Sequence, residues 1–220
     1  MSYNMSQLAT ARVRSLFVAA LVLGCALGTV TNAAAQTVTP PPTPIDITPP
    51  VGNVAFLKGS AVGTQGYTCL PTNTGGTAWT VNPPRPEATL FTYLFGLPLQ
   101  IITHFTSINE NPKPDAIPVS LAGNATWQSS LDTSRVWAKA TGHIDAGTDL
   151  ASCPHEGSIQ CLLLASIGNK KGPAGGRLLS NVTFVQRLNT NGGSAPPTAC
   201  TVGQTQLVPY TADYYFYHAE

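Results

Sequence analysis

The sequence predicts a mostly β fold, either an antiparallel β-sandwich or a partly open β-barrel with long loops, stabilised by disulfides. Three observations lead to this class. Apolar residues recur with a period nearer to two than to 3.6 over most of the chain. Turn-forming residues are frequent, with 20 glycines and 19 prolines among 220 residues. Of the five cysteines, four follow residue 35, and an even number is typical of a disulfide framework.

The first 35 residues have the features of a secretory signal peptide. Arg12 and Arg14 provide a positive start, an uncharged apolar stretch spans 16–27, and Ala33-Ala34-Ala35 forms a small-residue cleavage site. The apolar stretch is shorter than the roughly 20 residues that cross a bilayer as a helix. We therefore expect a secreted or periplasmic protein with no transmembrane segment in the mature chain. Lipid anchoring through Cys25, which follows Gly24, is the alternative.

The charge of the expected mature chain excludes one class of partner. Without Arg12 and Arg14, nine basic residues face ten acidic ones, and no basic stripe is present. This balance argues against nucleic acid as a partner. Charged residues are only 10% of the chain, far fewer than the roughly 25% of average soluble domains. Gly, Pro, Thr, Ser and Asn take their place, as in many extracellular β proteins.

The chain is expected to form a Pro-rich linker over residues 36–50 and one β-rich domain over residues 51–220. Residues 86–95 fit a short helix as well as they fit a strand that ends before Gly96. Turns are expected at 73–76 and 189–193, where Asn and Gly accept positive φ. The strongest strand patterns, rich in β-branched and aromatic residues, are 64–69, 99–105, 136–140, 182–188 and 214–217.

The four remaining cysteines, Cys69, Cys153, Cys161 and Cys200, allow three disulfide connectivities. Cys153 and Cys161 bracket a turn-rich loop and are able to close it locally, which would leave Cys69 to pair with Cys200. A zinc site that includes His155 is the alternative, but no C-x-x-C pair supports it. We expect no metal and no cofactor.

Several long motifs resemble an uncharacterised family of exported bacterial and fungal proteins, a domain of unknown function. The similarity covers residues 45 to 218. It rests on Gly66-Tyr67-Thr68-Cys69, Thr103-His104-Phe105, Asn124-Ala125-Thr126-Trp127, Asp132-Thr133-Ser134-Arg135-Val136-Trp137, Cys161-Leu162-Leu163-Leu164, the segment 182–193 (VTFVQRLNTNGG) and the segment 208–217 (VPYTADYYFY).

This resemblance implies no activity. It does imply that Cys69 and Cys200 belong to the family pattern, whereas the pair Cys153 and Cys161 is a feature of a subgroup. Some fungal members are labelled malate dehydrogenase, and the residues speak against that label here. A dinucleotide fold needs a Gly-x-Gly-x-x-Gly turn between a strand and a helix, and the glycine cluster at 168–176 has the wrong spacing and contains Pro173.

His104 is the candidate catalytic or binding residue, since it lies on a predicted strand among apolar residues. A structural, hydrogen-bonded histidine is the more common occurrence at such a position. His143 and Asp145 lie two residues apart on one side of a strand, and with His104 they would make a three-ligand metal site, although no spacing fixes it. No nucleophile elbow, zincin motif or phosphate-binding loop appears in the sequence.

Arg135, Arg187 and Asp213 are charges within otherwise neutral motifs. A carboxylate–guanidinium pair between two of them would satisfy charges on partly buried strands. The alternative is that one of them anchors a polar ligand in a groove.

Aromatic residues are numerous for a domain with so few charges, and Tyr215 and Tyr217 face one side of their strand while Tyr214 and Phe216 face the other. One set is expected in the core, and the other is available to stack on sugars or other flat ligands. The candidate binding residues are His104, Trp127, Arg135, Trp137, Tyr215 and Tyr217.

These observations lead to a non-enzymatic extracellular or envelope protein that binds a carbohydrate or another envelope component. The alternative is a secreted hydrolase or metal-dependent enzyme centred on His104.

Overall fold

The computed structural model describes residues 38–114 and 123–220. The expected signal peptide, residues 1–35, and the alternative lipid-anchor residue Cys25 lie outside these ranges. Over the part that the structure describes, no helix has the length and hydropathy of a membrane span.

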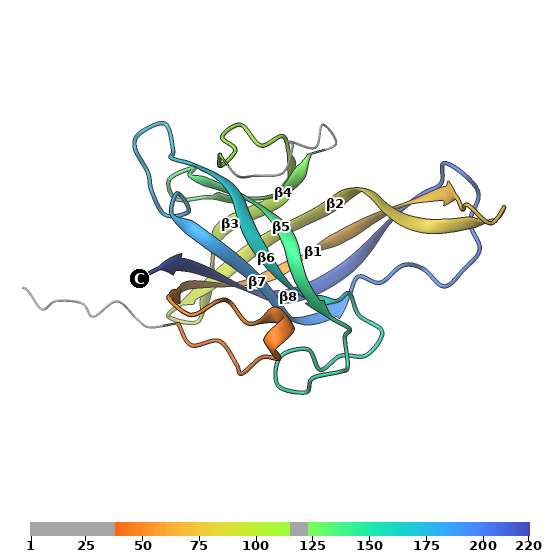
Figure 1. The fold of residues 1–220 in the computed structure, drawn as a ribbon, viewed down its shortest axis with the longest axis horizontal. Coiled ribbons are helices and arrows are strands. Elements are labelled where there is room, and N and C mark those ends of the chain that lie inside the picture. The colour runs from red at the N-terminus through yellow and green to blue at the C-terminus, as the bar shows by residue number, and fades with distance from the viewer. Residues whose placement is uncertain (1–37, 115–122) are drawn as a thin grey trace, which may run out of the picture. The chain divides into compact units, whose positions relative to one another are not determined.

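Eight antiparallel strands form a closed barrel in which each strand pairs with its neighbour in the chain and β8 pairs with β1 (Figure 1). The predicted β class is thus confirmed, and of the two architectures the barrel is present, in a fully closed form. Pairing runs around the whole ring, although β2 pairs with β3 only from Ala88 onward and its earlier residues pair with β1 alone. The strands are β1 (Asn53–Pro71), β2 (Thr77–Leu94), β3 (Leu97–Ser107), β4 (Asn124–Ser129), β5 (Arg135–Ile144), β6 (Cys161–Lys170), β7 (Val182–Gly192) and β8 (Thr205–Ala219).

The predicted strand segments all lie within these strands, and the ambiguous segment 86–95 belongs to β2. Its expected helix does not form, because the segment pairs with β1 on one side and β3 on the other. Phe95 and Gly96 make the two-residue hairpin turn that follows, both at positive φ (51° and 80°). Two positive φ values are what the tightest hairpin turns require.

The expected turn at 189–193 is an irregular end of β7 rather than a separate turn. The β7–β8 register shifts between Leu188 and Asn191, and Asn189 has a φ of 50°. Gly192 and Gly193 also have positive φ. A β-bulge of this kind bends a strand and redirects the side chains around it.

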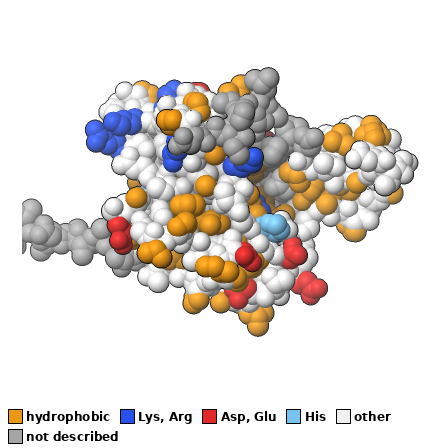
Figure 2. Space-filling view, in the orientation of Figure 1, with side chains coloured by type: hydrophobic (Ala, Val, Ile, Leu, Met, Phe, Trp, Pro, Cys, Tyr) orange, Lys and Arg blue, Asp and Glu red, His pale blue; other side chains and the backbone are white. Residues whose placement is uncertain are grey.

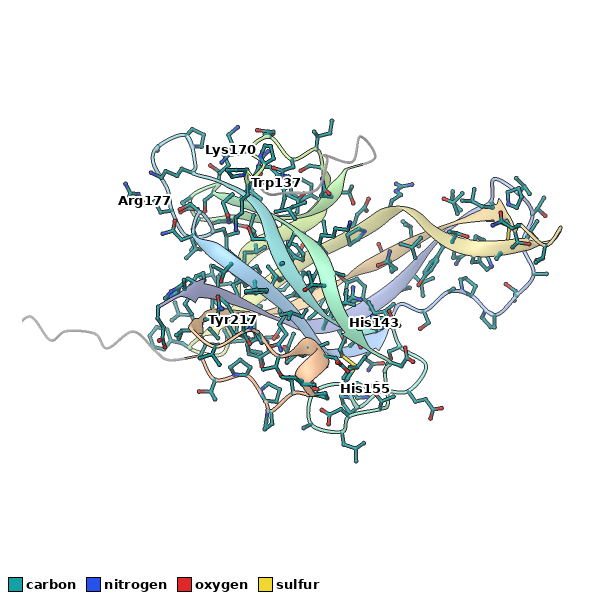
Figure 3. All side chains as sticks on the ribbon, in the orientation of Figure 1. Trp137, His143, His155, Lys170, Arg177 and Tyr217 are labelled. Carbon is teal, nitrogen blue, oxygen red and sulfur yellow. A yellow bond between two sulfur atoms is a disulfide. The ribbon has the colours of Figure 1, made fainter. Side chains whose placement is uncertain are left out.

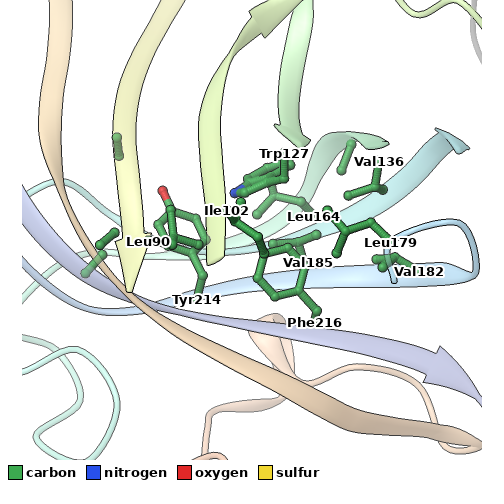
Figure 4. Packing of buried hydrophobic residues seen from close by; sticks show 14 of the residues in the cluster. Leu90, Ile102, Trp127, Val136, Leu164, Leu179, Val182, Val185, Tyr214 and Phe216 are labelled. Atoms are coloured by element: carbon green, nitrogen blue, oxygen red, sulfur yellow. The ribbon is translucent and has the colours of Figure 1, made fainter. Parts of the chain in front are cut away.

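An inner hydrophobic cluster packs inside the barrel (Figure 4). Its largest members come from seven strands, β2 to β8, and from the β6–β7 loop: Leu90, Ile102, Trp127, Val136, Leu164, Leu179, Val182, Val185, Tyr214 and Phe216. Leu179 of the loop is fully buried and closes this end of the barrel. The loop is held by hydrogen bonds from the Leu178 amide to Asp132 (2.8 Å) and from the Leu179 amide to Ser134 Oγ (2.9 Å).

A second cluster lies on the outer face of the barrel, beneath the N-terminal segment. The described part of the expected linker, residues 38–50, lies against this face and forms the short 3₁₀ helix η1 (Ile45–Ile47). Ile47 is fully buried, and its carbonyl accepts a hydrogen bond from Gln186 Nε2 (2.6 Å). The segment approaches β5 so closely that a Cβ on Gly142 would lie 1.8 Å from the Asp46 carbonyl oxygen.

Two disulfides join Cys69 to Cys200 and Cys153 to Cys161. The first ties the β1–β2 extension, which projects beyond the other strands in Figure 1, to the segment before β8. The second closes the loop between β5 and β6 beside the outer cluster. Disulfides of this kind suggest an oxidising, extracytoplasmic environment.

Candidate functional site

A cavity of about 770 Å³ adjoins the inner cluster inside the barrel, and Trp127, Leu164 and Tyr214 belong to both. Its wall is formed by side chains from β1 to β8 and from the loops that precede β6 and follow β7. Five of the wall residues are exposed where the cavity opens: Val81, Lys139, Ala140, Gln160 and Ala195. The apolar wall residues include Val81, Pro86, Ala138, Ala140, Leu162, Leu164 and Tyr214, and the polar ones include Gln65, His104, Asn124, Ser158, Gln160, Arg187 and Ser194.

The cavity exists because several inward positions carry small side chains. Ala138 and Ala140 line it from β5, and Ala125 lines it from β4. Elsewhere in the same interior, the inward positions carry Ile102 and Leu90, which are fully buried in the inner cluster. The alternation of strand residues thus directs both large and small side chains inward, and their sizes decide where space remains.

His104 lies in the cavity wall, only 3% exposed, and stacks on Trp127. Its Nδ1 is 2.8 Å from the Thr126 carbonyl oxygen. A carbonyl only accepts hydrogen bonds, so Nδ1 carries the proton and a neutral ring has Nε2 as an acceptor. Burial lowers the pKa of His104 to about 3, against the opposing effect of the Thr126 hydrogen bond and with a further lowering by the Arg187 charge. The ring is therefore neutral at ordinary pH.

Arg187 supplies a positive charge to the cavity wall. Its Nε and Nη2 donate to the Gln160 carbonyl oxygen at 3.2 and 2.8 Å. No carboxylate of the described residues lies within 4.0 Å of its guanidinium. Asp145 belongs to the same hydrogen-bond network, but its carboxylate accepts from the side chain of Gln160 (Nε2, 2.8 Å) and not from Arg187. The charge of Arg187 acts on neighbouring groups. Burial raises the pKa of Tyr67, and the Arg187 charge partly opposes this rise.

Two buried donors of β4 residues lack a hydrogen-bond partner among the described residues. They are Nε1 of Trp127 and Nδ2 of Asn124, and both residues belong to the cavity wall. A buried donor without a partner costs about 1–3 kcal/mol. Native proteins keep few such groups, and they are more frequent near functional sites.

The structure brings two of the candidate binding residues, His104 and Trp127, together at the cavity and places the other four elsewhere. Arg135 begins β5 and pairs with Glu110 (2.9 Å). Trp137 is fully buried with its Nε1 donating to Ser107 Oγ (2.9 Å), and it does not line the cavity. Figure 3 shows Trp137 and Tyr217 at separate places on the barrel.

Tyr215 and Tyr217 face the outside of the barrel but are buried there, at 4% and 5% exposure, in the outer cluster. The Tyr217 hydroxyl donates to Gln186 Oε1 (2.6 Å), and Lys58 Nζ lies 5.5 Å from the centroid of the Tyr215 ring. Both faces of this stretch of β8 are therefore buried, because residues 38–50 cover the outer one. The stacking surface expected from these tyrosines is not exposed.

The expected pairing among Arg135, Arg187 and Asp213 does not occur. Asp213 pairs with Lys58 (3.0 Å), and Arg135 pairs with Glu110. Arg187 instead lines the cavity. The sequence did contain a signal for this position. Arg187 is two residues after Val185 on β7, so both side chains point to the same face of the strand, and Val185 is buried. The sequence gave no comparable signal for Gln65 and Tyr67, which face the cavity from β1.

His104, His143 and Asp145 do not come together. His104 is inside the barrel, whereas His143 is exposed on β5. In the described ranges, no three His, Cys, Asp or Glu side chains are grouped closely enough to hold a metal ion.

Comparison with known proteins gives one match. The model of a family described as "Protein of unknown function (DUF3455)" matches residues 50–218. Neither the curated proteins nor the solved structures contain a match to the chain.

Proposed function

Because the chain belongs to the DUF3455 family, whose description names no function, we propose a role from the cavity: a non-enzymatic, exported binding protein that holds one small molecule inside its barrel. The observation that carries the proposal is the cavity of about 770 Å³. Its volume falls within the roughly 300–1,000 Å³ of small-molecule sites. Eight-stranded barrels have an interior wide enough for one such ligand.

The chemistry of the wall favours binding over catalysis. The described wall residues include no Asp or Glu to act as a general acid or base. His104 is neutral, its Nδ1 is engaged by Thr126, and its face is covered by Trp127. An enzyme centred on His104 would need a nucleophile or a carboxylate within reach of its Nε2, and no contact of the described residues supplies one.

The same wall indicates the type of ligand. Carbohydrates are recognised through many hydroxyl contacts, whereas most of the wall from β2, β5 and β6 is aliphatic. An envelope component with an apolar body therefore fits the cavity better than a sugar does. The polar groups, grouped around His104 and Arg187, would orient such a ligand.

The proposal is tested by titrating the purified full-length protein with two probes, 1-pyrenebutanol and maltotriose. Energy transfer from tryptophan to pyrene reports binding close to Trp127, and calorimetry reports binding of the sugar. We expect saturable pyrenebutanol binding that weakens at least fivefold in A195W, because Ala195 lies at the exposed mouth. A174W, on the exposed β6–β7 loop at the closed end, is the matched control and is expected to bind as the wild type does.

Binding of maltotriose that A195W abolishes would support the cavity as a ligand site and assign it to carbohydrates. Binding of neither probe, with 1-pyrenebutyrate also failing to bind, would overturn the proposed function. Equal binding by A195W and the wild type would also overturn it, because the ligand would then lie outside the barrel.

A further inference from the structure

Among the described residues, Arg187 has no carboxylate partner, and the described cavity wall contains no Asp or Glu. The described wall residues include two cations, Arg187 and Lys139, and neither forms an ion pair with a described carboxylate. Figure 2 shows that Lys and Arg elsewhere gather at the upper left, where Figure 3 labels Lys170 and Arg177. Arg187 is thus distinct from the surface cations because it is partly buried and faces the barrel interior.

The hydrogen bonds that Arg187 makes to described residues leave one edge of its guanidinium without a partner among those residues. Nε and Nη2 share the Gln160 carbonyl oxygen, which fixes the plane of the group. The remaining hydrogens include those on the edge between Nη1 and Nη2. Two parallel N–H groups on that edge match the two oxygens of a carboxylate.

The anchoring also pre-organises the site. Arginine has a large rotamer entropy, and less of it is lost on binding when the side chain is already held. Removing a partly buried guanidinium from water without an anion is unfavourable, and an anionic ligand would offset that cost. The Arg187 charge also acts on the wall residue Tyr67, where it opposes the effect of burial on the pKa of the phenol.

Resting on the binding function proposed above, we propose that the ligand is a small amphiphile with one carboxylate, which pairs with Arg187 while its apolar body fills the barrel. The apolar body would lie against the aliphatic side chains of β5 and β6, towards Trp127. Neutral His104 adds no charge to this pair, and its Nε2 accepts from a hydroxyl or amide of the ligand if one is present.

The experiment compares two probes of similar size that differ in charge, 1-pyrenebutyrate and 1-pyrenebutanol. Both are titrated into the purified full-length protein at low ionic strength, with tryptophan-to-pyrene energy transfer as the signal. We expect the wild type to bind the carboxylate at least tenfold more tightly than the alcohol. In R187Q this preference is expected to fall below twofold through loss of carboxylate affinity, with alcohol affinity unchanged within twofold.

Two further variants separate the role of Arg187 from general charge. R187K keeps the positive charge but lacks the two parallel N–H groups of a guanidinium. It is expected to retain part of the preference for the carboxylate. R177Q removes an exposed cation at the closed end and is expected to keep all of it. Circular dichroism melts verify that each variant is folded.

If both probes bind the wild type equally, or if R187Q keeps the preference, the carboxylate assignment is overturned while the binding function stands. If K139Q loses the preference for the carboxylate and R187Q does not, the choice of Arg187 is overturned as well. If neither pyrene probe binds the wild type, the carboxylate assignment is overturned, and if maltotriose also fails to bind, the proposed function itself fails. A preference that R187Q alone abolishes supports the inference.

Discussion

His104 lies flat on Trp127, with ring centroids 4.2 Å apart and planes 6° apart. Tyr214 meets both rings edge-on, at 5.5 Å from His104 and 5.8 Å from Trp127. The three side chains come from β3, β4 and β8, so the stack links the core to the cavity. This arrangement holds a histidine in its neutral form within an aromatic group.

The neutral histidine predicts a specific dependence of stability on pH. In the unfolded chain His104 takes up a proton below its ordinary pKa of 6.5, whereas in the folded protein it does so only near pH 3. Its burial therefore reduces the free energy of unfolding as the pH falls from 6.5 towards 3, by up to about 1.4 kcal/mol per pH unit. Above pH 6.5 it has no such effect.

Urea unfolding between pH 4 and 7.5 tests this expectation by comparing the wild type with H104F. The variant is expected to lose stability less steeply below pH 6.5. H155Q, which changes an exposed loop histidine, serves as the control and is expected to follow the wild type. Parallel curves for H104F and the wild type would contradict this expectation, because His104 would then have the same pKa in the folded and the unfolded protein.

Asp132 is expected to stabilise the closed end of the barrel. Burial acts to raise the pKa of its carboxyl, but hydrogen bonds from the Leu178 amide and from Ser134 outweigh burial and lower it to about 2. D132A would leave these donors unpaired beneath Leu179. We expect a loss of about 2 kcal/mol in the free energy of unfolding, measured by urea denaturation at pH 7.

The control for this variant is E87Q, because Glu87 is exposed and lies 3.9 Å from Arg85. It is expected to change stability by less than about 0.5 kcal/mol. A D132A protein as stable as E87Q would contradict the role given to Asp132.

The two disulfides are expected to contribute unequally. The Cys69–Cys200 bridge closes a sequence separation of 131 residues, and the Cys153–Cys161 bridge closes one of 8. Loop-closure entropy assigns about 5 kcal/mol to the first and about 2.5 kcal/mol to the second. Thermal melting of C69S/C200S is therefore expected to occur at a lower temperature than that of C153S/C161S.

The opposite order would show that local packing of the short bridge, which lies beside Thr190, outweighs loop closure. Free-thiol titration of the unreduced, denatured wild type verifies the starting state. It is expected to detect no thiol at the four bridged positions.

Gly142 is expected to control the docking of the N-terminal segment. A Cβ there would meet the Asp46 carbonyl, so G142A must displace η1 and expose Ile47. We expect endoproteinase Asp-N to cleave at Asp46 at least tenfold faster in G142A than in the wild type. The matched control is G76A, where a Cβ would make only an ordinary contact with Thr72 (3.5 Å). Equal cleavage of both variants would mean that the segment is not held at Gly142.

Much of the fold could be predicted from the sequence, but β4 and β6 were not recognised as strands, and the segment in β2 fitted a helix and a strand equally well. The predicted segments in β1, β3, β5, β7 and β8 are rich in β-branched and aromatic residues. β6 begins with the apolar run Cys161–Leu164, whose period favours neither a helix nor a strand. β4 has only six residues, and short strands give weak patterns.

The candidate site was predicted only in part, and the residues of β8 show why. Its sequence places Tyr214 and Phe216 on one face and Tyr215 and Tyr217 on the other, but both pairs are apolar enough for a core. If the residues of one face had been polar, they would have marked it as the solvent side, and the other face would have been recognised as the inner one. The outer face here is apolar because residues 38–50 cover it, so strand periodicity could not distinguish the two.

The sequence by itself determined the β class and the spacing of cysteines that are able to bridge. It did so because strand propensity, turn residues and cysteine number are local properties. The tertiary structure alone decided that the sheet closes, that Trp137 and Tyr217 lie away from the cavity, and that Arg187 faces His104 across it. These relationships depend on strand register and barrel closure, which bring together residues that are far apart in the chain.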